Sequence, residues 1–576
     1  MTIVSVFLDC LSILPNESQT SLKDTFAIVS SFHHLINSAA SIMNRTPKQE
    51  DDPHHDVLEK NDVDHVELAE NYHVAAGSPL HKTTWLIKVL GFYTGMAGFI
   101  VNFDLQYTGY VLVMQPFNRD FGTCTMVNGV ETCRLSATGQ SLSSSIYLLF
   151  MAVGAFMSGF TSNYLGTRSS VQFGCIWVIA GAAGMSGTAG NLLAYIACKC
   201  IGAVGLGHLQ SSSITFAVEC APPRTRGLLI TLFATGSGVG SLVVGGVCYG
   251  TAKLTTSWSW KIPILLQVPI GLAFGIAMFF FPESPRWLVN KNKIPQARKA
   301  FGKLYRVDPD SSEVTSQILD VQLTIEEAQK MGAGRSWATI FHQRFIRRTL
   351  TALAINVGAG LCGTFFIFTY AAIFFQQLGG FRNSIEISIT INGGLFVGLI
   401  CGPFLVELIG RRMSMIIGYL GMMTCMLIFS ASNSGGGHTD VVRNAQVAFL
   451  VIFAFIYGAF TSSAHWVASA EMHSVRDRAV GQAFVMVVTN IFIFATNFWT
   501  PYMINPQYGN MGTNVGYFYF GVEAVTMFIL WFIFPETARL TLEQIDDYFS
   551  SGRKAWRTSL KRNKKIASGE ISSKDA

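Results

Sequence analysis

The feature that most constrains this chain of 576 residues is a series of long apolar segments that begins near Trp85 and continues almost to the C-terminus. An α-helix needs about 20 predominantly apolar residues to cross the hydrocarbon core of a bilayer. Segments of that kind are predicted at residues 86–115, 140–163, 169–189, 191–217, 227–250, 262–281, 349–376, 384–408, 412–431, 445–470, 479–504 and 515–534. The sequence therefore predicts an all-α membrane protein with twelve transmembrane helices in two groups of six.

The composition excludes the main alternative, a soluble protein of several domains. Only 13% of the residues are charged, against about 25% in typical soluble domains, and 50% are hydrophobic. The 11 cysteines are dispersed, which argues against a disulfide scaffold. The sequence also contains no nucleophile–base set, metal-ligand spacing or phosphate-binding loop. We therefore expect no enzyme activity, no cofactor and no nucleic-acid partner.

The polar segments define five regions and an orientation. We expect a largely disordered N-terminal tail at 1–84, helical bundles at 85–282 and 349–535, a central loop with short helices at 283–348, and a C-terminal tail at 536–576. Lysines and arginines gather in the central loop and the C-terminal tail, so the positive-inside rule places both termini in the cytoplasm, with the plasma membrane as the expected location. The alternative to this role in orientation is that the C-terminal cluster of lysines and arginines contacts anionic lipid headgroups.

The N-terminal tail has two further features. Residues 50–70 contain nine acidic residues and one lysine, which is typical of a disordered arm. A normal tail would begin at Met43, so residues 1–42 are expected to be dispensable.

Three short motifs occur once in each half of the chain, about 250 residues apart. Each half has a Gly-x-Arg motif between its second and third helices, an E-x4-R-x-R motif after its fourth helix and a Pro-Glu pair after its sixth. The glycines of the first motif are Gly166 and Gly410, the glutamates of the second are Glu219 and Glu471, and those of the third are Glu283 and Glu536. Paired motifs at one offset predict two parallel six-helix repeats with a solute site between them.

Taken in order, these motifs resemble the sugar porter branch of the major facilitator superfamily, in a form similar to fungal members. The matching pieces are Trp260-Lys-Ile-Pro263 with Gln267, Pro282-Glu-Ser-Pro-Arg-Trp-Leu288, Glu407-Leu-Ile-Gly-Arg-Arg412 and Pro535-Glu-Thr537. The resemblance covers residues 85–550 and implies the major facilitator fold, and a secondary active transporter of a sugar or polyol that works by alternating access. Partners would be the lipid bilayer, a small solute and protons, with the chain a monomer. A transporter or exporter of a non-sugar metabolite and a non-transporting nutrient receptor are the alternatives.

Charged residues at the predicted cytoplasmic helix ends form a candidate gating network. In the family, such residues act as a latch that closes the inner face when the cavity opens outward; the alternative is a set of static topology anchors. The first half departs from the family pattern, with Asn163-Tyr164 in place of Asp-Arg. The network comprises Glu219, Arg226, Glu283, Arg286, Glu407, Arg411, Arg412, Glu471, Arg478 and Glu536.

Ionisable residues inside apolar spans are costly and point to function. Asp104 lies in the first predicted span and Lys199 in the fourth. Proton-coupled sugar porters have a carboxylate and an arginine at the corresponding places, so the resemblance implies that Asp104 and Lys199 couple protons to transport. A fixed ion pair that stabilises the bundle is the alternative. His208 and His465 also lie in spans and are expected to be hydrogen-bonded helix residues.

The predicted substrate site departs from the sugar porter pattern. Ala234 stands where the fifth helix usually has a glutamine, and Phe365 stands where the seventh usually has an asparagine. Fewer amides and more aromatic rings favour a solute with fewer hydroxyl groups, although the rings could equally pack within the bundle. The candidate contacts are Gln267, Phe365, Tyr370, Asn392, Trp466, Asn490 and Asn497. Cys124 and Cys133, in the first predicted outward loop, are a possible disulfide.

Overall fold

The computed structural model describes residues 84–127, 130–221, 226–330, 341, 343–378, 384–432, 440–473, 478–505, 507–540, 545, 548–549 and 554–567. The acidic segment 50–70 and residues 1–42 lie outside the described residues. Within the described part, twelve helical segments are long and apolar enough to cross a membrane, which confirms the predicted number.

The first six spans are built from seven helices and a short 3-10 turn. They are α4 (Trp85–Val111), α6 (Ala137–Leu165), α7 (Thr167–Ser186), α8 (Leu192–Cys220), α9 (Arg226–Thr251), and α10 (Trp258–Leu265) continued by α11 (Gln267–Ala277) and η2 (Met278–Phe280). Side-chain caps mark several helix starts: Thr84 accepts from the amide of Ile87, and Ser136 accepts from that of Gly139. The sixth span begins at Trp258, four residues before the predicted position.

The second six spans include two interrupted ones. They are α15 (Gln343–Leu361) with η4 (Phe366–Tyr370) and α16 (Ala371–Leu378), α17 (Ser384–Ile409), α18 (Arg411–Ala431), α19 (Asp440–Ile456) with η5 (Tyr457–Ser462) and α20 (Ser463–Met472), α21 (Arg478–Ile504), and α22 (Val515–Ile533). The segments η4 and η5 are turns of π-helix, which often occur near functional sites.

The two ends of the bundle differ in their connections. One end, here called the hairpin end, has helix α5 (Gln115–Phe121) and the antiparallel strands β1 (Thr123–Val127) and β2 (Val130–Arg134). Cys124 and Cys133 are paired across these strands and joined by a disulfide. The other, the loop end, has α12 (Pro285–Asn290), α13 (Ile294–Tyr305) and α14 (Ser312–Lys330), together with η7 (Ala555–Arg557) and α24 (Leu560–Ala567).

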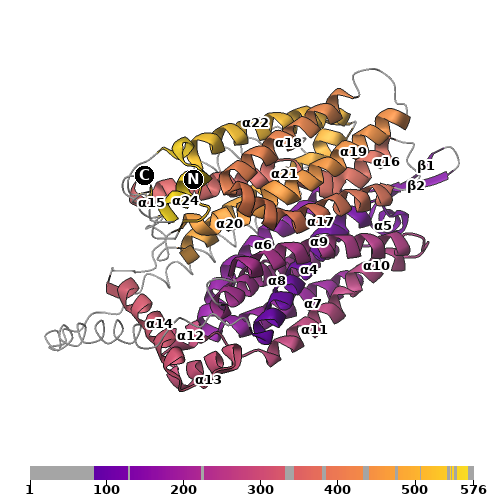
Figure 1. Cartoon of the computed structure of the whole chain (residues 1–576). Helices are drawn as coiled ribbons and strands as arrows, with labels where there is room; N and C mark the ends of the chain where they lie inside the picture. The colour runs from indigo at the N-terminus through magenta and orange to yellow at the C-terminus, as the bar shows by residue number, and fades with distance from the viewer. Residues whose placement is uncertain are drawn as a thin grey trace. The chain divides into compact units, whose positions relative to one another are not determined.

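The halves meet along pairs of helices that come from different repeats. Helix α6 packs on α21, α9 packs on α17, and α4 contacts η4 and α16 (Figure 1). At the α4–η4 contact the backbones approach closely, since a β-carbon on Gly109 would lie 2.6 Å from the carbonyl oxygen of Thr369. Gly109 is close to the end of α4 at Val111, so this contact lies at the hairpin end.

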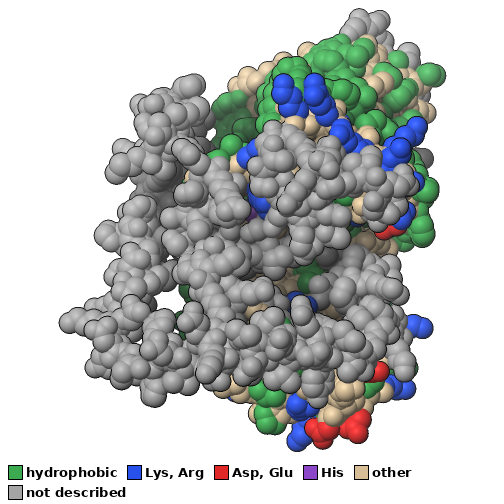
Figure 2. Space-filling view, turned by 60° about the vertical axis from the view of Figure 1, so that its left-hand side comes forward, with side chains coloured by type: hydrophobic (Ala, Val, Ile, Leu, Met, Phe, Trp, Pro, Cys, Tyr) green, Lys and Arg blue, Asp and Glu red, His purple; other side chains and the backbone are tan. Residues whose placement is uncertain are grey.

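The outward faces of the spans are apolar, as a lipid-facing surface requires. Large exposed side chains include Phe92, Leu193, Phe404, Leu408 and Phe528, each more than 60% exposed. Figure 2 brings the loop end forward and shows apolar side chains on the upper part of the molecule, with Lys and Arg side chains above and below the central region. The chain is a multi-pass membrane protein.

Candidate functional site

A carboxylate and an ammonium group are buried at the same depth of the first bundle. Asp104 lies seven residues before the end of α4, and Lys199 lies seven residues after the start of α8, so both are about 10 Å from the hairpin end. Their side chains are 4% and 1% exposed, and the carboxylate of Asp104 faces both Lys199 and Gln267. The structure therefore brings together the two residues that the sequence picked out separately.

Lys199 is held by groups other than the carboxylate. Its ammonium donates to the hydroxyl of Thr108 and, over 3.0 Å, to the carbonyl oxygen of Ser143, and it lies 4.0 Å from the centre of the Tyr147 ring. Among the described residues, no ion pair within 4.0 Å joins Lys199 to Asp104. The two groups therefore interact across the site without a direct hydrogen bond in this conformation.

The site is connected to the second half through α6. Ser144, next to Ser143, is hydrogen-bonded to the hydroxyl of Tyr370, which itself donates over 3.0 Å to the carbonyl oxygen of Asn497. Ser141, on the same helix, donates to the carbonyl oxygen of Phe498 over 3.0 Å. The backbone that holds Lys199 is thus part of the seam between the halves.

Two amides among the predicted solute contacts have an unused polar atom. Gln267 is 3% exposed, and its side-chain amide faces the carboxylate of Asp104, but its Nε2 makes no hydrogen bond within 3.5 Å among the described residues. Asn392 donates to the hydroxyl of Tyr110 over 3.0 Å, across the α4–α17 contact, while its Oδ1 is likewise without a partner there. An unsatisfied buried polar group is costly, so these atoms are candidates to pair with a solute or with water.

The other predicted contacts are distributed over the second half. Asn490 is 8% exposed on α21, two turns before the seam residue Asn497 on the same face of the helix, and the side-chain amide of Asn497 donates to the carbonyl oxygen of Ile493. Trp466 is half-buried on α20 beside the ring of His465, with the ring centres 4.8 Å apart. Phe365 is half-buried at the start of η4.

The seventh span is broken at its centre. Helix α15 ends at Leu361, Gly363 has φ of +76°, and the chain resumes as the π-turn η4. Two aromatic residues of η4 pack within the second half: Phe366 stacks on Tyr519 and Phe368 lies against Tyr457 of η5. Phe366 and Phe368 are therefore packing residues. Phe365 is only half-buried and is the aromatic residue of this segment that stays a candidate solute contact.

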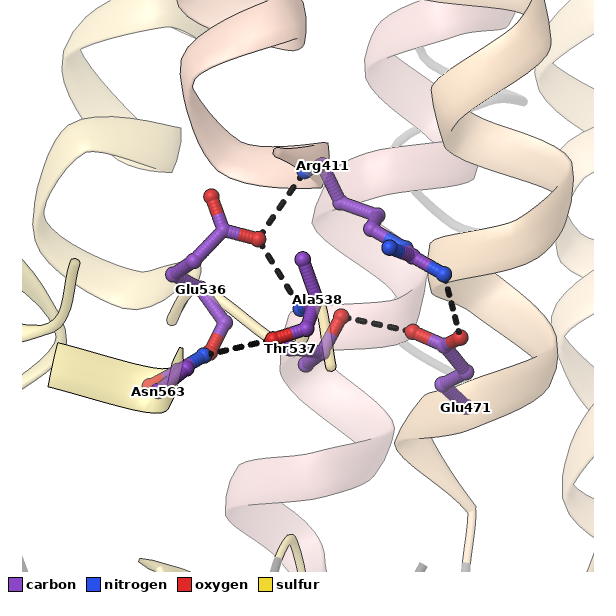
Figure 3. Close-up of polar contacts among 6 residues, drawn as sticks. All are labelled: Arg411, Glu471, Glu536, Thr537, Ala538 and Asn563. Carbon is purple, nitrogen blue, oxygen red and sulfur yellow. Dashed lines mark hydrogen bonds and ion pairs between the residues drawn. The ribbon is translucent and has the colours of Figure 1, made fainter. Parts of the chain in front are cut away.

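At the loop end, Glu536 closes the start of α18. Its carboxylate accepts from the backbone amide of Arg411, at 2.9 Å, and from that of Ala538 (Figure 3). It also accepts from the backbone amide of Arg412, at 3.2 Å. Glu471 accepts from the guanidinium of Arg411 at 3.5 Å and from the hydroxyl of Thr537 at 2.6 Å. A carboxylate at the N-terminus of a helix is stabilised by the free amides and by the helix dipole.

The first half repeats this arrangement. Glu283 accepts from the backbone amide of Arg168 at 2.8 Å and from the hydroxyl of Thr167, which also donates to Glu219 at 3.3 Å. Glu219 in turn lies near Arg286. The paired motifs of the sequence thus form one structural device in two copies.

The rest of the predicted gating network is only partly placed. The backbones of Arg226 and Arg478 begin α9 and α21, but their side chains lie outside the described residues. Arg286 and Glu407 are exposed. The described contacts of this network join residues of the same half.

Comparison with known proteins decides the family. A model described as "Sugar (and other) transporter" matches residues 90–549. The chain belongs to this family. Among curated members, the low-affinity glucose transporter HXT1 of Saccharomyces cerevisiae is 24% identical and covers 92% of each chain. The probable glucose transporter rco-3 of Neurospora crassa is 24% identical, over 81% of this chain and 80% of its own length.

Similarity to solved structures shows that the chain has the major facilitator fold. The proton:xylose symporter XylE bound to 6-bromo-6-deoxy-D-glucose matches with a TM-score of 0.66 at 18% identity, over 81% of this chain and 100% of that one. XylE from E. coli in a partially occluded inward-open conformation matches with a TM-score of 0.65 at 17% identity, over 79% and 99%. The predicted fold and family are both confirmed.

One buried carboxyl group is absent from the residues that the sequence predicted for the site. Glu523 lies in the middle of α22 and is 0% exposed. Like Asp104, it is an ionisable residue inside an apolar span, so the sequence alone marks it as a candidate. His208, by contrast, has the environment expected of it: its Nε2 is hydrogen-bonded to Thr161 at 2.8 Å and to Ser170 at 2.9 Å.

Proposed function

We propose that this sugar transporter family member is a proton-coupled secondary active transporter that works by alternating access. The observation that carries the proposal is the burial of Asp104 beside Lys199 without a direct ion pair. A carboxylate in this position exchanges its proton without breaking a bond to lysine, because the ammonium is already held by Thr108 and Ser143. The structural relative XylE is described as a proton:xylose symporter.

The driving force of one proton is sufficient for strong accumulation. One charge that moves through about 100 mV gains about 2.3 kcal/mol. Two pH units add about 2.7 kcal/mol. The sum of about 5 kcal/mol supports solute accumulation of roughly a thousandfold or more.

The conformation described is proposed to be open toward the loop end. The described hydrogen bonds between the halves, such as Ser141–Phe498 and Thr138–Tyr502, lie at the hairpin end. Among the described contacts at the loop end, Glu283, Arg411 and Glu536 have partners in their own half. In the opposite state these charges would bridge the halves, as a latch requires.

The proposed solute is a hexose or a polyol, because the curated relatives are named as glucose transporters. A second candidate is a solute with fewer hydroxyl groups. It is favoured by Ala234 and Phe365, which supply no amide where the family pattern has one. Restoring both amides, with Ala234→Gln and Phe365→Asn, should then raise hexose affinity.

The test is uptake into proteoliposomes of the purified full chain. Radiolabelled glucose, xylose, a polyol and a monocarboxylate would each be offered with an imposed proton gradient, with its reverse and with none. We expect one solute class to accumulate only when protons flow in the same direction. Equal uptake under all three conditions would contradict proton coupling, and uptake of the monocarboxylate alone would favour the second candidate.

A further inference from the structure

The second bundle contains a buried carboxyl group that the mechanism above does not use. Glu523 lies eight residues after Val515 in a helix of 19 residues, about 12 Å from its start. Its side chain is 0% exposed. Neither Oε1 nor Oε2 has a hydrogen-bond partner among the described residues.

In the part of the chain that the structure describes, the neighbours of Glu523 supply no compensating positive charge. Helix α22 packs on α15 and α18, and the titratable groups that face Glu523 are Cys362, which directly follows α15, and Tyr419 and Cys425 of α18. All three are neutral in their ordinary state. Even after relaxation, an unpaired buried carboxylate costs several kcal/mol, whereas a neutral carboxylic acid costs far less. The conformation described therefore holds Glu523 as the protonated acid.

Glu523 lies next to the break in the seventh span, because Cys362 at the break is one of the groups that face it. Cys362 is the residue before Gly363, where the helix is interrupted, and a β-carbon on Gly363 would lie 2.9 Å from the ring of Tyr519, one turn before Glu523. A β-carbon on Gly358 would lie 3.0 Å from the hydroxyl of Tyr419. Any rearrangement of the break thus changes what surrounds the carboxyl group.

A donor for the charged form is already present. The hydroxyl of Tyr419 is buried and, like the carboxyl oxygens, has no hydrogen-bond partner in the part of the chain that the structure describes. When the break moves and admits water, the O–H bond of the acid breaks and the proton leaves as hydronium. The remaining carboxylate then accepts from water and from Tyr419.

We infer that Glu523 is a second proton-binding site of this transporter, loaded in the conformation described and unloaded when the break at Cys362–Gly363 rearranges. The inference rests on the proposed proton-coupled function, but it places a proton in the second half of the transporter, whereas Asp104 lies in the first half. Its ligand is the proton itself.

The experiment measures the infrared carbonyl band of a neutral carboxylic acid in proteoliposomes of the full chain, with no solute present. At neutral pH we expect this band in the wild type, a shift of the band when glutamate is labelled with ¹³C, and its loss in Glu523→Gln. Glutamine preserves the size of the acid and lacks the proton. The variant Thr526→Val, one turn away on the same helix, should keep the band, as should Asp104→Asn.

Transfer to D₂O tests the unloading step. As the protein moves between its conformations, the Glu523 band should shift within minutes, because the proton leaves and a deuteron replaces it. A wild type without a glutamate-dependent band would show that Glu523 is ionised and overturn the inference. A band that never shifts in D₂O would show a permanently neutral acid and overturn it equally. Failure of solute transport would leave the infrared band of the neutral acid unchanged, so proton loading of Glu523 and the proposed transport function fail separately.

Discussion

At the scale of single residues, Asp104 and Lys199 have different roles: the lysine is held in place by other groups, and the aspartate is free to gain or lose a proton. Lys199 is fixed by Thr108, by the carbonyl oxygen of Ser143 and by the ring of Tyr147. Asp104 faces the ammonium without being bonded to it. The lysine thus supplies a constant positive field, and the carboxylate is the group whose charge changes. A neutral amide at position 104 therefore prevents the proton-binding step of the transport cycle, while the contacts that hold Lys199 stay in place.

We expect Asp104→Asn to abolish accumulation against a gradient while solute exchange at equal concentrations continues. Accumulation should fall from roughly a thousandfold to onefold, because the variant takes up no proton and gains none of its free energy. Parallel measurements of gradient-driven uptake and of counterflow in the same proteoliposomes would check this. Uphill uptake at the wild-type level would contradict the role of Asp104.

The sequence was sufficient to find these two residues and insufficient to find their partners. An ionisable side chain in an apolar span is visible without a structure, and the same test applied to α22 would have found Glu523. The bonds of Lys199 depend on how α6 is rotated against α8, and that rotation is set by packing. No local pattern around Ser143 or Thr108 marks them as ligands of an ammonium group.

At the scale of elements, the start of α18 is fixed by a remote carboxylate and a glycine. Gly410 has φ of +98°, a conformation that residues with a side chain rarely adopt, and a β-carbon there would overlap Glu536 Oε2. Glu536 accepts from the amides of Arg411 and Arg412, which have no partner within the helix. One glycine and one glutamate thus make the turn and cap the helix together.

Gly410→Ala should lower the thermal stability of the protein in detergent. The strained backbone costs about 1 kcal/mol or more, and displacing the carboxylate removes a cap worth about 0.5–2 kcal/mol. Thermal unfolding by intrinsic fluorescence would measure the loss. Gly521→Ala on α22 is the matched control, since a β-carbon there meets nothing within 4 Å. Equal melting temperatures for the two variants would show that the cap contributes nothing.

Helix positions were predictable to within a few residues, but interruptions inside helices were not. The span that contains Gly363 is as apolar as its neighbours, so hydropathy predicts one continuous helix at 349–376. The break and the π-turns η4 and η5 arise where Phe366 stacks on Tyr519 and Phe368 lies against Tyr457. These contacts join residues far apart in sequence, and short-range periodicity does not encode them.

At the scale of the whole molecule, the seam at the hairpin end decides which conformation is stable. It includes a close backbone approach between Gly109 of α4 and Thr369 of η4. The seam also includes the hydrogen bonds from Ser141 to Phe498 and from Ser144 to Tyr370. A transporter must make and break this whole set in every cycle, so its free energy has to stay small. A single added methyl group is therefore enough to change the balance between the two states.

Gly109→Ala should shift the population toward the state that is open at the hairpin end. The β-carbon would lie 2.6 Å from the carbonyl oxygen of Thr369, and overpacking of this kind costs about 1–3 kcal/mol. Since about 1.4 kcal/mol changes an equilibrium tenfold, the closed state should lose at least several-fold in population. Spin labels at the exposed positions Leu193 and Tyr517, one in each half, would report a second, longer distance.

The matched control for this measurement is Gly246→Ala on α9, where a β-carbon meets nothing within 4 Å. It should leave the distance distribution between the two labels as it is in the wild type. If Gly109→Ala also left that distribution unchanged, the close approach of α4 and η4 would not hold the hairpin end shut. The conformational balance would then have to be set by the charged residues at the loop end, where Arg411 and Glu471 would be the next residues to neutralise.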